Sequence, residues 1–284
     1  RGEFDVNVEL PSGYIPGKGR NDDVVLVYSK LAIGTGYRPV ESYLKRLYTD
    51  SEGNVVADTI KVFDKEMKAS SKEGLRAVTE FVKKEFPAKG YGMIFSSHGS
   101  GWLPEGYFYD PHAYEQEHGA KSSSRTAPSS LKPRFGDTPS GPLPLTDPYY
   151  GITRSLGQEK VADSDALYEM TVNEFAEGIA LHLDFLLFDV CFSGGIEVFY
   201  GLKDVADYIG GSPAEVLAEG MFDYTKITSF LLKGREYDLE GLFKNSFDRY
   251  NNLDLDVPYA LGEVYRSSTV CLVRTDRMEE LGSV

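Results

Sequence analysis

Two side chains in the sequence, those of His98 and Cys191, have the chemistry of a nucleophile and its proton acceptor. His98 follows the apolar run 93–95, and Cys191 follows the apolar run 185–188. An imidazole beside a thiol favours the thiolate, and the resulting imidazolium can later protonate a leaving amine. The backbone N–H groups of Gly99 and Cys191 would then be available to bind a developing oxyanion. These residues predict acyl transfer by a cysteine nucleophile.

A structural interpretation competes with this prediction. A cysteine or a histidine that follows an apolar strand is more often a buried core residue than a reactive one. We favour the reactive pair because glycines flank both strand ends, with Gly99 after the histidine and Gly194 and Gly195 after the cysteine. The second cysteine, Cys271, lies inside an apolar run and is predicted to be a core residue.

The elements that would position this pair alternate between strands and helices. Strands are predicted at residues 24–28, 43–49, 55–63, 92–96, 185–188, 207–209 and 267–274, with 43–49 and 55–63 paired as a hairpin. Helices are predicted after the capping boxes 70–73 and 171–174, and at 196–202, 224–232 and 239–250. This order predicts an α/β fold, with a mostly parallel sheet covered by helices on both faces. In such a sheet, ligands bind beyond the carboxyl ends of the strands.

One long segment does not fit the alternation. From residue 103 to about residue 165 the sequence is rich in serine and proline and shows no helical period. A stretch of this length without structure is uncommon inside a compact domain, so we interpret it as an inserted loop. We therefore expect one domain over residues 1–284, with a loop insertion at 103–165. A helix that begins near residue 276 reaches the chain end, which indicates that the C-terminal part is cut short.

The composition restricts the classes of partner. The 284 residues include 30 Lys and Arg against 44 Asp and Glu, a net charge of −14, with 41% hydrophobic and 26% charged residues. Such a chain has a full-sized core, repels nucleic acid and anionic lipid, and attracts cationic substrates. No apolar run is long enough to span a bilayer, and two cysteines cannot form a disulfide framework. The spacing of His112, Glu115, Glu117 and His118 matches no usual zinc motif, so no metal site is predicted.

The motifs around the reactive pair resemble those of a known family. The runs His-Gly-Ser-Gly-Trp at 98–102 and Phe-Asp-Val-Cys at 188–191 are similar to those of the clostripain family of cysteine peptidases, which share the caspase-like fold. The resemblance extends through the blocks 154–158, 197–204 and 207–220, and covers residues 24–224. It implies a caspase-like endopeptidase that cleaves after Arg or Lys, with Cys191 as the nucleophile and His98 as the general acid and base.

The resemblance also implies which residues bind the substrate. Asp189, two residues before the nucleophile, matches the acid of the specificity pocket, and Glu219 is similar to a second acid at its rim. Two alternatives stay open: Asp189 as a strand-end side chain that accepts backbone N–H bonds, and Glu219 as a solvated loop charge. The chain departs from the family pattern at Val190, Phe192 and Ser193, none of which removes a reacting group.

Further expectations concern activation and location. Members of the family commonly cleave themselves after a basic residue in a loop between the two motifs, where this chain has Lys121, Arg125, Lys132 and Arg134. They are usually secreted or held at the bacterial cell surface or in the periplasm, and the start at Arg1 without a leader fits a processed chain. Calcium dependence occurs in the family, although no calcium-ligand loop can be identified here. Protein or peptide substrates with basic residues are the expected partners, with neither nucleic acid nor a membrane-spanning segment.

Two other functions remain as alternatives. The chain could be a secreted binding or scaffold protein that keeps the caspase-like fold without catalysis. It could also be a clan relative with another specificity, such as a legumain-like or caspase-like enzyme. An electronegative pocket disfavours the acidic specificity of caspases.

Overall fold

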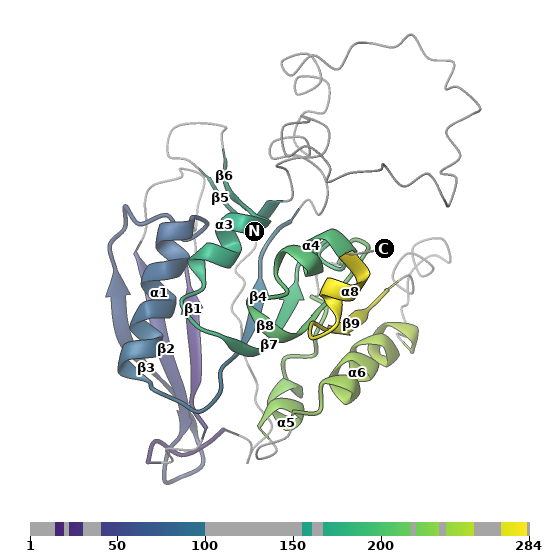
Figure 1. Ribbon diagram of the computed structural model, residues 1–284. Coiled ribbons are helices and arrows are strands. Elements are labelled where there is room, and N and C mark those ends of the chain that lie inside the picture. The colour runs from purple at the N-terminus through teal and green to yellow at the C-terminus, as the bar shows by residue number, and fades with distance from the viewer. Residues whose placement is uncertain are drawn as a thin grey trace, which may run out of the picture.

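The computed structural model describes residues 15–19, 23–30, 41–99, 155–160, 167–216, 220–232, 237–252 and 268–282 (Figure 1). Within these residues the chain forms an α/β fold with three sheets. The strands are β1 (Val25–Ser29), β2 (Ser42–Thr49), β3 (Val55–Phe63), β4 (Gly92–Ser96), β5 (Ser155–Lys160), β6 (Leu167–Thr171), β7 (Leu183–Asp189), β8 (Ala206–Gly211) and β9 (Cys271–Arg274). The helices are α1 (Lys72–Glu85), α3 (Val172–Gly178), α4 (Ile196–Gly201), α5 (Ile227–Leu231), α6 (Leu239–Asn251) and α8 (Met278–Gly282).

A four-stranded sheet with the order β4-β7-β8-β9 forms the centre of the fold. β7 is parallel to both β4 and β8, whereas β9 runs antiparallel to β8. The side chains of β7 alternate between two apolar clusters, as the two-residue period of a strand requires. Leu186 and Phe188 belong to one cluster, and Phe185 and Leu187 belong to the other. The continuous apolar run of β7 therefore reflects burial on both faces of the sheet.

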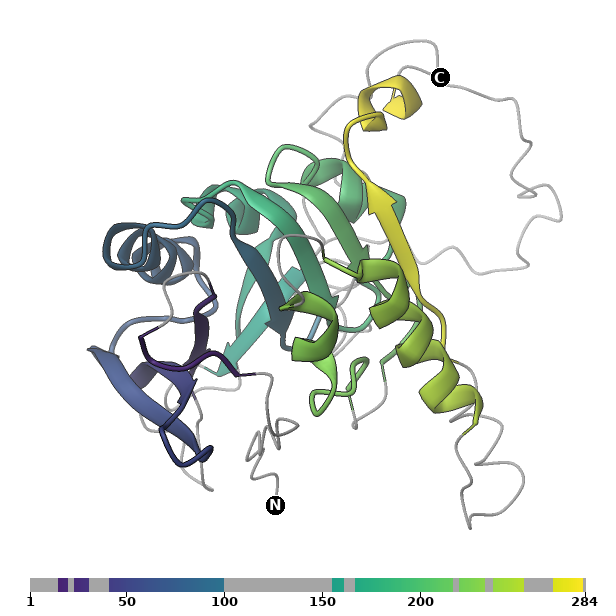
Figure 2. The same ribbon diagram turned by 90° about the horizontal axis from the view of Figure 1, so that it is seen from below.

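Helices cover both faces of this sheet. The cluster that contains Phe188 includes residues from α1, α3, α4 and α8, and the cluster that contains Leu187 includes residues from α5 and α6. Figure 2 shows α5 and α6 lying along one side of the four-stranded sheet. Within the described ranges, no helix is long and apolar enough to cross a membrane.

A second sheet lies beside the first, and it corrects the expectation of one mostly parallel sheet. β1, β2 and β3 are paired antiparallel, with β2 in the middle. The hairpin prediction is confirmed, but the strand predicted at 24–28 joins this hairpin instead of the central sheet. This sheet packs against α1, and the apolar cluster between the sheet and the helix contains Leu44, Phe63 and Val78. All five residues of β1 are half-buried.

The third sheet pairs β5 antiparallel with β6 and corrects the boundary of the predicted insertion. Residues 155–160 were expected to belong to the loop, yet they form β5. The strand was not recognised because its apolar content is small, and Leu156 is the core residue that it supplies. The remaining residues of the 103–165 insertion lie outside the described part of the chain.

The two predicted capping boxes have different outcomes. The Thr171–Glu174 box is confirmed, since Thr171 Oγ1 accepts the Glu174 N–H at 3.2 Å and Glu174 Oε2 accepts the Thr171 N–H at 2.8 Å. The box predicted to begin at Ser70 is wrong by one residue. Ser71 is the N-cap of α1, and its hydroxyl accepts the N–H of Gly74 at 3.1 Å.

Candidate active site

The parallel pairing of β4 with β7 positions His98 and Cys191. Ser96 is the register partner of Asp189, at the last residue of each strand. The pairing continues one step further, since Ser97 N–H donates to the Asp189 carbonyl at 3.4 Å. His98 and Cys191 each follow two residues after the Ser96–Asp189 pair. The two residues therefore occupy matching positions beyond the carboxyl ends of neighbouring parallel strands.

Strand β5 holds the backbone around His98. Gly157 N–H donates to the His98 carbonyl at 3.0 Å, and Gly99 forms an isolated antiparallel bridge with Leu156. Because the Gly157 N–H bonds to the residue before Gly99, Gly99 and Leu156 form a pair that does not exchange hydrogen bonds. The Gly99 N–H is therefore directed away from β5, on the same side as the Ser97 N–H that bonds β7. The Gly99 N–H thus points to the side of β4 on which β7, the strand before Cys191, is paired.

The turn after Cys191 is held by hydrogen bonds to the segment after β8. Phe192 N–H donates to the Ala214 carbonyl at 2.9 Å, and Gly194 N–H donates to the Ser212 carbonyl at 2.8 Å. Phe192 has a φ of 56°, in the left-handed region that side chains other than glycine and asparagine rarely adopt. Strained residues of this kind cluster at functional sites, where the surrounding contacts maintain them.

The Cys191 thiol is half-buried and bonded to the backbone of Val216. Its Sγ accepts the Val216 N–H at 3.3 Å and donates to the Val216 carbonyl at 3.5 Å. Burial, and then the negative charges of Glu215 and Asp189, raise the pKa of the Cys191 thiol, while the Val216 N–H opposes them. Among the described residues, both hydrogen bonds of the thiol go to Val216 and none goes to the exposed His98. Burial and these contacts therefore favour the thiol over the thiolate in this arrangement.

The Asp189 carboxylate is buried at the end of β7, with 6% of the residue exposed. It accepts the Met221 N–H at 2.6 Å and the Tyr224 hydroxyl at 2.8 Å. Burial raises the pKa of Asp189, and these two hydrogen bonds, together with the charge of Arg249, partly offset that effect. The contacts are those of the structural alternative that the sequence left open for Asp189. Each carboxylate oxygen can accept a further hydrogen bond, so the contacts leave acceptor capacity for a substrate group.

A small pocket lies beside these two residues. Ser212, Glu215, Val216, Met221 and Tyr250 line it, together with Ser268 and Thr269. The pocket adjoins Cys191 through Val216 and Asp189 through Met221. Glu215 is exposed, and its negative charge contributes to the raised pKa of the Cys191 thiol. The sequence did not reveal this effect because the residue lies in a segment without periodicity. Glu219 lies outside the described residues.

Other residues with reactive or metal-binding side chains are not part of this site. Cys271 is half-buried against the first apolar cluster, as predicted, and its Sγ lies 3.3 Å from the Gly211 carbonyl oxygen. His182 pairs with Asp207 at 2.8 Å, and both side chains are exposed. The described part of the chain contains no cluster of three metal-ligating side chains, and the group from His112 to His118 lies outside it.

The fold and the site define an α/β protein that presents a cysteine and a histidine beyond two neighbouring parallel strands. The model of the clostripain family, peptidase family C11, matches residues 13–121 and 145–281. The chain therefore belongs to the clostripain family. No curated protein is similar enough to match the chain.

Several solved structures are similar to this chain, among them two C11 proteases. An inactive zymogen of a C11 protease from Parabacteroides distasonis is 23% identical with a TM-score of 0.61, over 93% of this chain and 55% of that chain. A secreted C11 cysteine protease from Bacteroides thetaiotaomicron, in complex with an irreversible peptide inhibitor, is 21% identical with a TM-score of 0.60, over 92% of this chain and 58% of that chain. At these identities the similarity shows a common fold. The chain spans a little more than half the length of these proteins.

Proposed function

We propose that this protein is a cysteine endopeptidase with a caspase-like fold, in which Cys191 and His98 form the catalytic dyad. The observation that carries the proposal is the matching placement of the two residues, each two positions beyond the Ser96–Asp189 pair of β4 and β7. Membership of the clostripain family and the common fold with C11 proteases support the same activity.

In the proposed reaction, His98 takes the proton of the Cys191 thiol and the thiolate attacks the scissile carbonyl carbon. The carbonyl oxygen becomes an oxyanion, which the N–H groups of Gly99 and Cys191 bind. The C–N bond then breaks, and the imidazolium gives its proton to the leaving amine. Water, deprotonated by His98, attacks the resulting thioester and regenerates the thiol.

The resting contacts of Cys191 must change before this reaction begins. The thiol donates to the Val216 carbonyl, and burial, followed by the charges of nearby carboxylates, raises its pKa, so the thiolate is disfavoured. Hydrogen bonds in unliganded active sites often tighten only when substrate binds. We propose that the described arrangement is a resting or precursor form, which fits self-processing at a basic residue of the 103–165 segment. One similar structure is an inactive zymogen of a C11 protease.

The proposed substrate has Arg or Lys before the scissile bond. Asp189 is buried two residues before the nucleophile, and Glu215 lies at the pocket that adjoins both Cys191 and Asp189. The pocket has room for about one water molecule, so it would have to widen before a guanidinium or ammonium could enter and pair with the buried Asp189 charge. Glu219 is proposed as a further acid of the rim, from the resemblance alone. Secretion and a calcium requirement are likewise proposals, supported by the family and, for secretion, by the secreted C11 neighbour.

The test is cleavage of fluorogenic peptides that end in Arg, Lys, Glu or norleucine. Wild-type protein is expected to cleave after Arg and Lys, and Cys191→Ala is expected to be inactive. Cys271→Ala provides a matched control, because Cys271 is also half-buried with its thiol against backbone carbonyls. Equal loss in the two variants would contradict a specific role for Cys191. A wild-type protein that binds these peptides without cleaving them would support the non-catalytic binding alternative.

A further inference from the structure

Strand β5 carries an irregularity at the residue that bonds His98. In the pairing of β5 with β6, Leu156 faces Met170 and Glu159 faces Tyr168, so β5 contains one extra residue between these pairs. Gly157 lies in this bulge with a φ of 80°. A bulge turns a backbone group out of its own ladder, and here the Gly157 N–H is donated to the His98 carbonyl. The position of the His98 backbone therefore depends on how firmly β5 is held.

Gly157 is itself closely packed between three elements. A Cβ at this position would lie 3.1 Å from Ser70 Oγ, 3.3 Å from Met170 Cε and 3.4 Å from Phe95 Cζ. Phe95 lies on β4, three residues before His98, and Ser70 lies in the turn before α1. Movement of this turn would be transmitted to the bulge and from there to His98.

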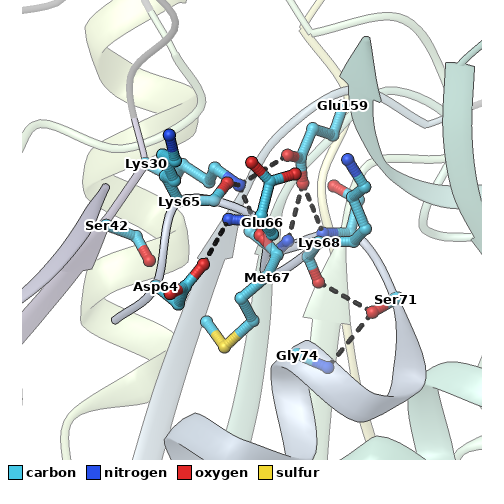
Figure 3. A network of polar contacts seen from close by, with 12 residues as sticks. Lys30, Ser42, Asp64, Lys65, Glu66, Met67, Lys68, Ser71, Gly74 and Glu159 are labelled. Atoms are coloured by element: carbon cyan, nitrogen blue, oxygen red, sulfur yellow. Dashed lines mark hydrogen bonds and ion pairs between the residues drawn. The ribbon is translucent and has the colours of Figure 1, made fainter. Parts of the chain in front are cut away.

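Glu159, two residues after Gly157, connects β5 to the turn before α1 through hydrogen bonds (Figure 3). One carboxylate oxygen accepts the N–H groups of Ala69 at 2.6 Å and Ser70 at 3.3 Å. The other oxygen lies 2.7 Å from the Lys30 ammonium, and the two side chains are only 16% and 7% exposed. Lys30 also donates to the carbonyls of Lys65 and Met67. Glu159 thus joins three separate segments of chain through buried, charged hydrogen bonds.

We infer that Glu159, with Lys30 as its partner, is a positioning residue for His98. The inference rests on the proposed dyad for its catalytic consequence, but the coupling itself concerns the hydrogen bond from Gly157 to His98. A buried ion pair such as Lys30–Glu159 adds little net stability, because the cost of removing both charges from water offsets their attraction. Its role here is to select one arrangement of the segments that it joins. Here the fixed geometry is the register of the bulged strand, and with it the position of the imidazole relative to Cys191.

The experiment compares wild type, Glu159→Gln and a control, Lys203→Met. Lys203 is the matched control because its side chain is 16% exposed and pairs with Asp204 and Glu279, away from β5. Amide hydrogen exchange followed by mass spectrometry reads the 155–160 and 95–99 segments. Steady-state kinetics on an Arg-terminated peptide read kcat, KM and the pH profile of kcat/KM.

For Glu159→Gln we expect exchange of the Gly157 amide to be at least tenfold faster, because its bond to His98 opens more often. We expect kcat to fall at least tenfold with KM within twofold, and the acid limb of the pH profile to shift, since His98 is misplaced while the pocket is intact. Lys203→Met should change none of these, even where it lowers the melting temperature.

Gly157 exchange equal to that of wild type overturns the inference, and so does a kcat within twofold of wild type. If Glu159→Gln does not fold, Lys30→Met/Glu159→Gln takes its place, since it buries no unpaired charge. The same faster exchange, with at least a threefold loss of kcat, is then expected. A wild-type protein that cleaves no peptide even after its 103–165 segment has been cut overturns the proposed dyad instead, and the exchange data still report whether Glu159 holds His98.

Discussion

Removal of the Asp189 carboxylate separates its structural role, the support of a buried loop, from its proposed role, the recognition of a basic substrate. The carboxylate accepts one backbone N–H and one hydroxyl, from Met221 and Tyr224, and is 6% exposed. Each buried donor left without a partner costs about 1–3 kcal/mol, so Asp189→Ala should lose about 2–6 kcal/mol of unfolding free energy. For a chain of this size that corresponds to a fall of roughly 4–20 °C in melting temperature.

The loss in substrate selection has a different magnitude and a different test. Truncation of a desolvated partner of a charge costs about 2–5 kcal/mol, or about 30- to 4,000-fold in kcat/KM for an Arg peptide. Asp189→Asn keeps an acceptor oxygen for the loop and removes the charge, so it should lose selection with a smaller loss of stability. The ratio of kcat/KM for Arg and norleucine peptides measures selection, and a thermal melt measures stability.

Tyr224→Phe is the control, because it removes one donor to Asp189 and leaves the charge in place. It should lose stability and keep the preference for Arg. An Asp189→Asn protein that is folded and still prefers Arg as strongly as wild type would refute the reasoning. The specificity acid would then be Glu215 or Glu219, which the variants Glu215→Gln and Glu219→Gln would distinguish.

Stability should also depend on pH through Asp189. Its folded pKa is raised above the ordinary aspartate value of 3.8, so the folded state binds more protons than the unfolded state just above that pH. The free energy of unfolding should therefore fall as pH rises from the ordinary aspartate range to the folded pKa. The Asn variant lacks this contribution, so the difference between the two proteins should vary with pH. A constant difference would show that burial does not perturb this carboxyl group.

Three further predictions concern the loop, the thiol and the insertion. Gly220→Ala places a Cβ 2.8 Å from Asp189 Oδ2 at a φ of 77°. It should therefore lose more unfolding free energy in chemical denaturation than the control Gly53→Ala, where φ is 88° and no atom lies within 4 Å. Equal losses would mean that the loop moves away from Asp189 without cost. Burial raises the pKa of the Cys191 thiol, so iodoacetamide should alkylate it in the resting protein only at a higher pH than an ordinary thiol requires. A dependence of the alkylation rate on pH equal to that of an ordinary thiol would contradict the contacts with Val216. On storage, wild type should yield two fragments that remain associated while Cys191→Ala stays intact on a denaturing gel, whereas equal nicking of both would point to an outside protease.

The sequence predicts the central sheet well because its strands have unusual composition. The apolar run at 185–188 is too short for a helix and is typical of a strand buried on both faces, and the structure extends it to β7, Leu183–Asp189. The positions of His98 and Cys191 beyond the ends of two strands followed from such runs, and the pairing of β4 with β7 in the structure brings both ends to the same edge. The strands β1 and β9 were predicted, but their antiparallel direction was not. Strand direction depends on tertiary pairing, which a local sequence pattern does not encode.

Other parts of the site carry no sequence signal that a local pattern could reveal. Glu159 and Gly157 lie in a polar stretch where one extra residue interrupts the alternation of the strand. Their importance comes from contacts with Lys30 and Ala69, which are distant in sequence. Similarly, Val216 contributes only its backbone to the thiol, so its side chain gives no indication of its role.

The alternation of β7 divides the site into two parts that can vary separately. Asp189 has the same parity as Phe185 and Leu187, and its partners Met221 and Tyr224 belong to the apolar cluster beneath α5 and α6. The backbone groups that hold His98 belong instead to β4 and β5. Exchange of the 220–252 segment between relatives could therefore alter which side chain the pocket accepts without moving the histidine. An insertion or deletion of one residue in β7 would have the opposite effect, because it would turn Asp189 toward the other cluster and change recognition and catalysis together.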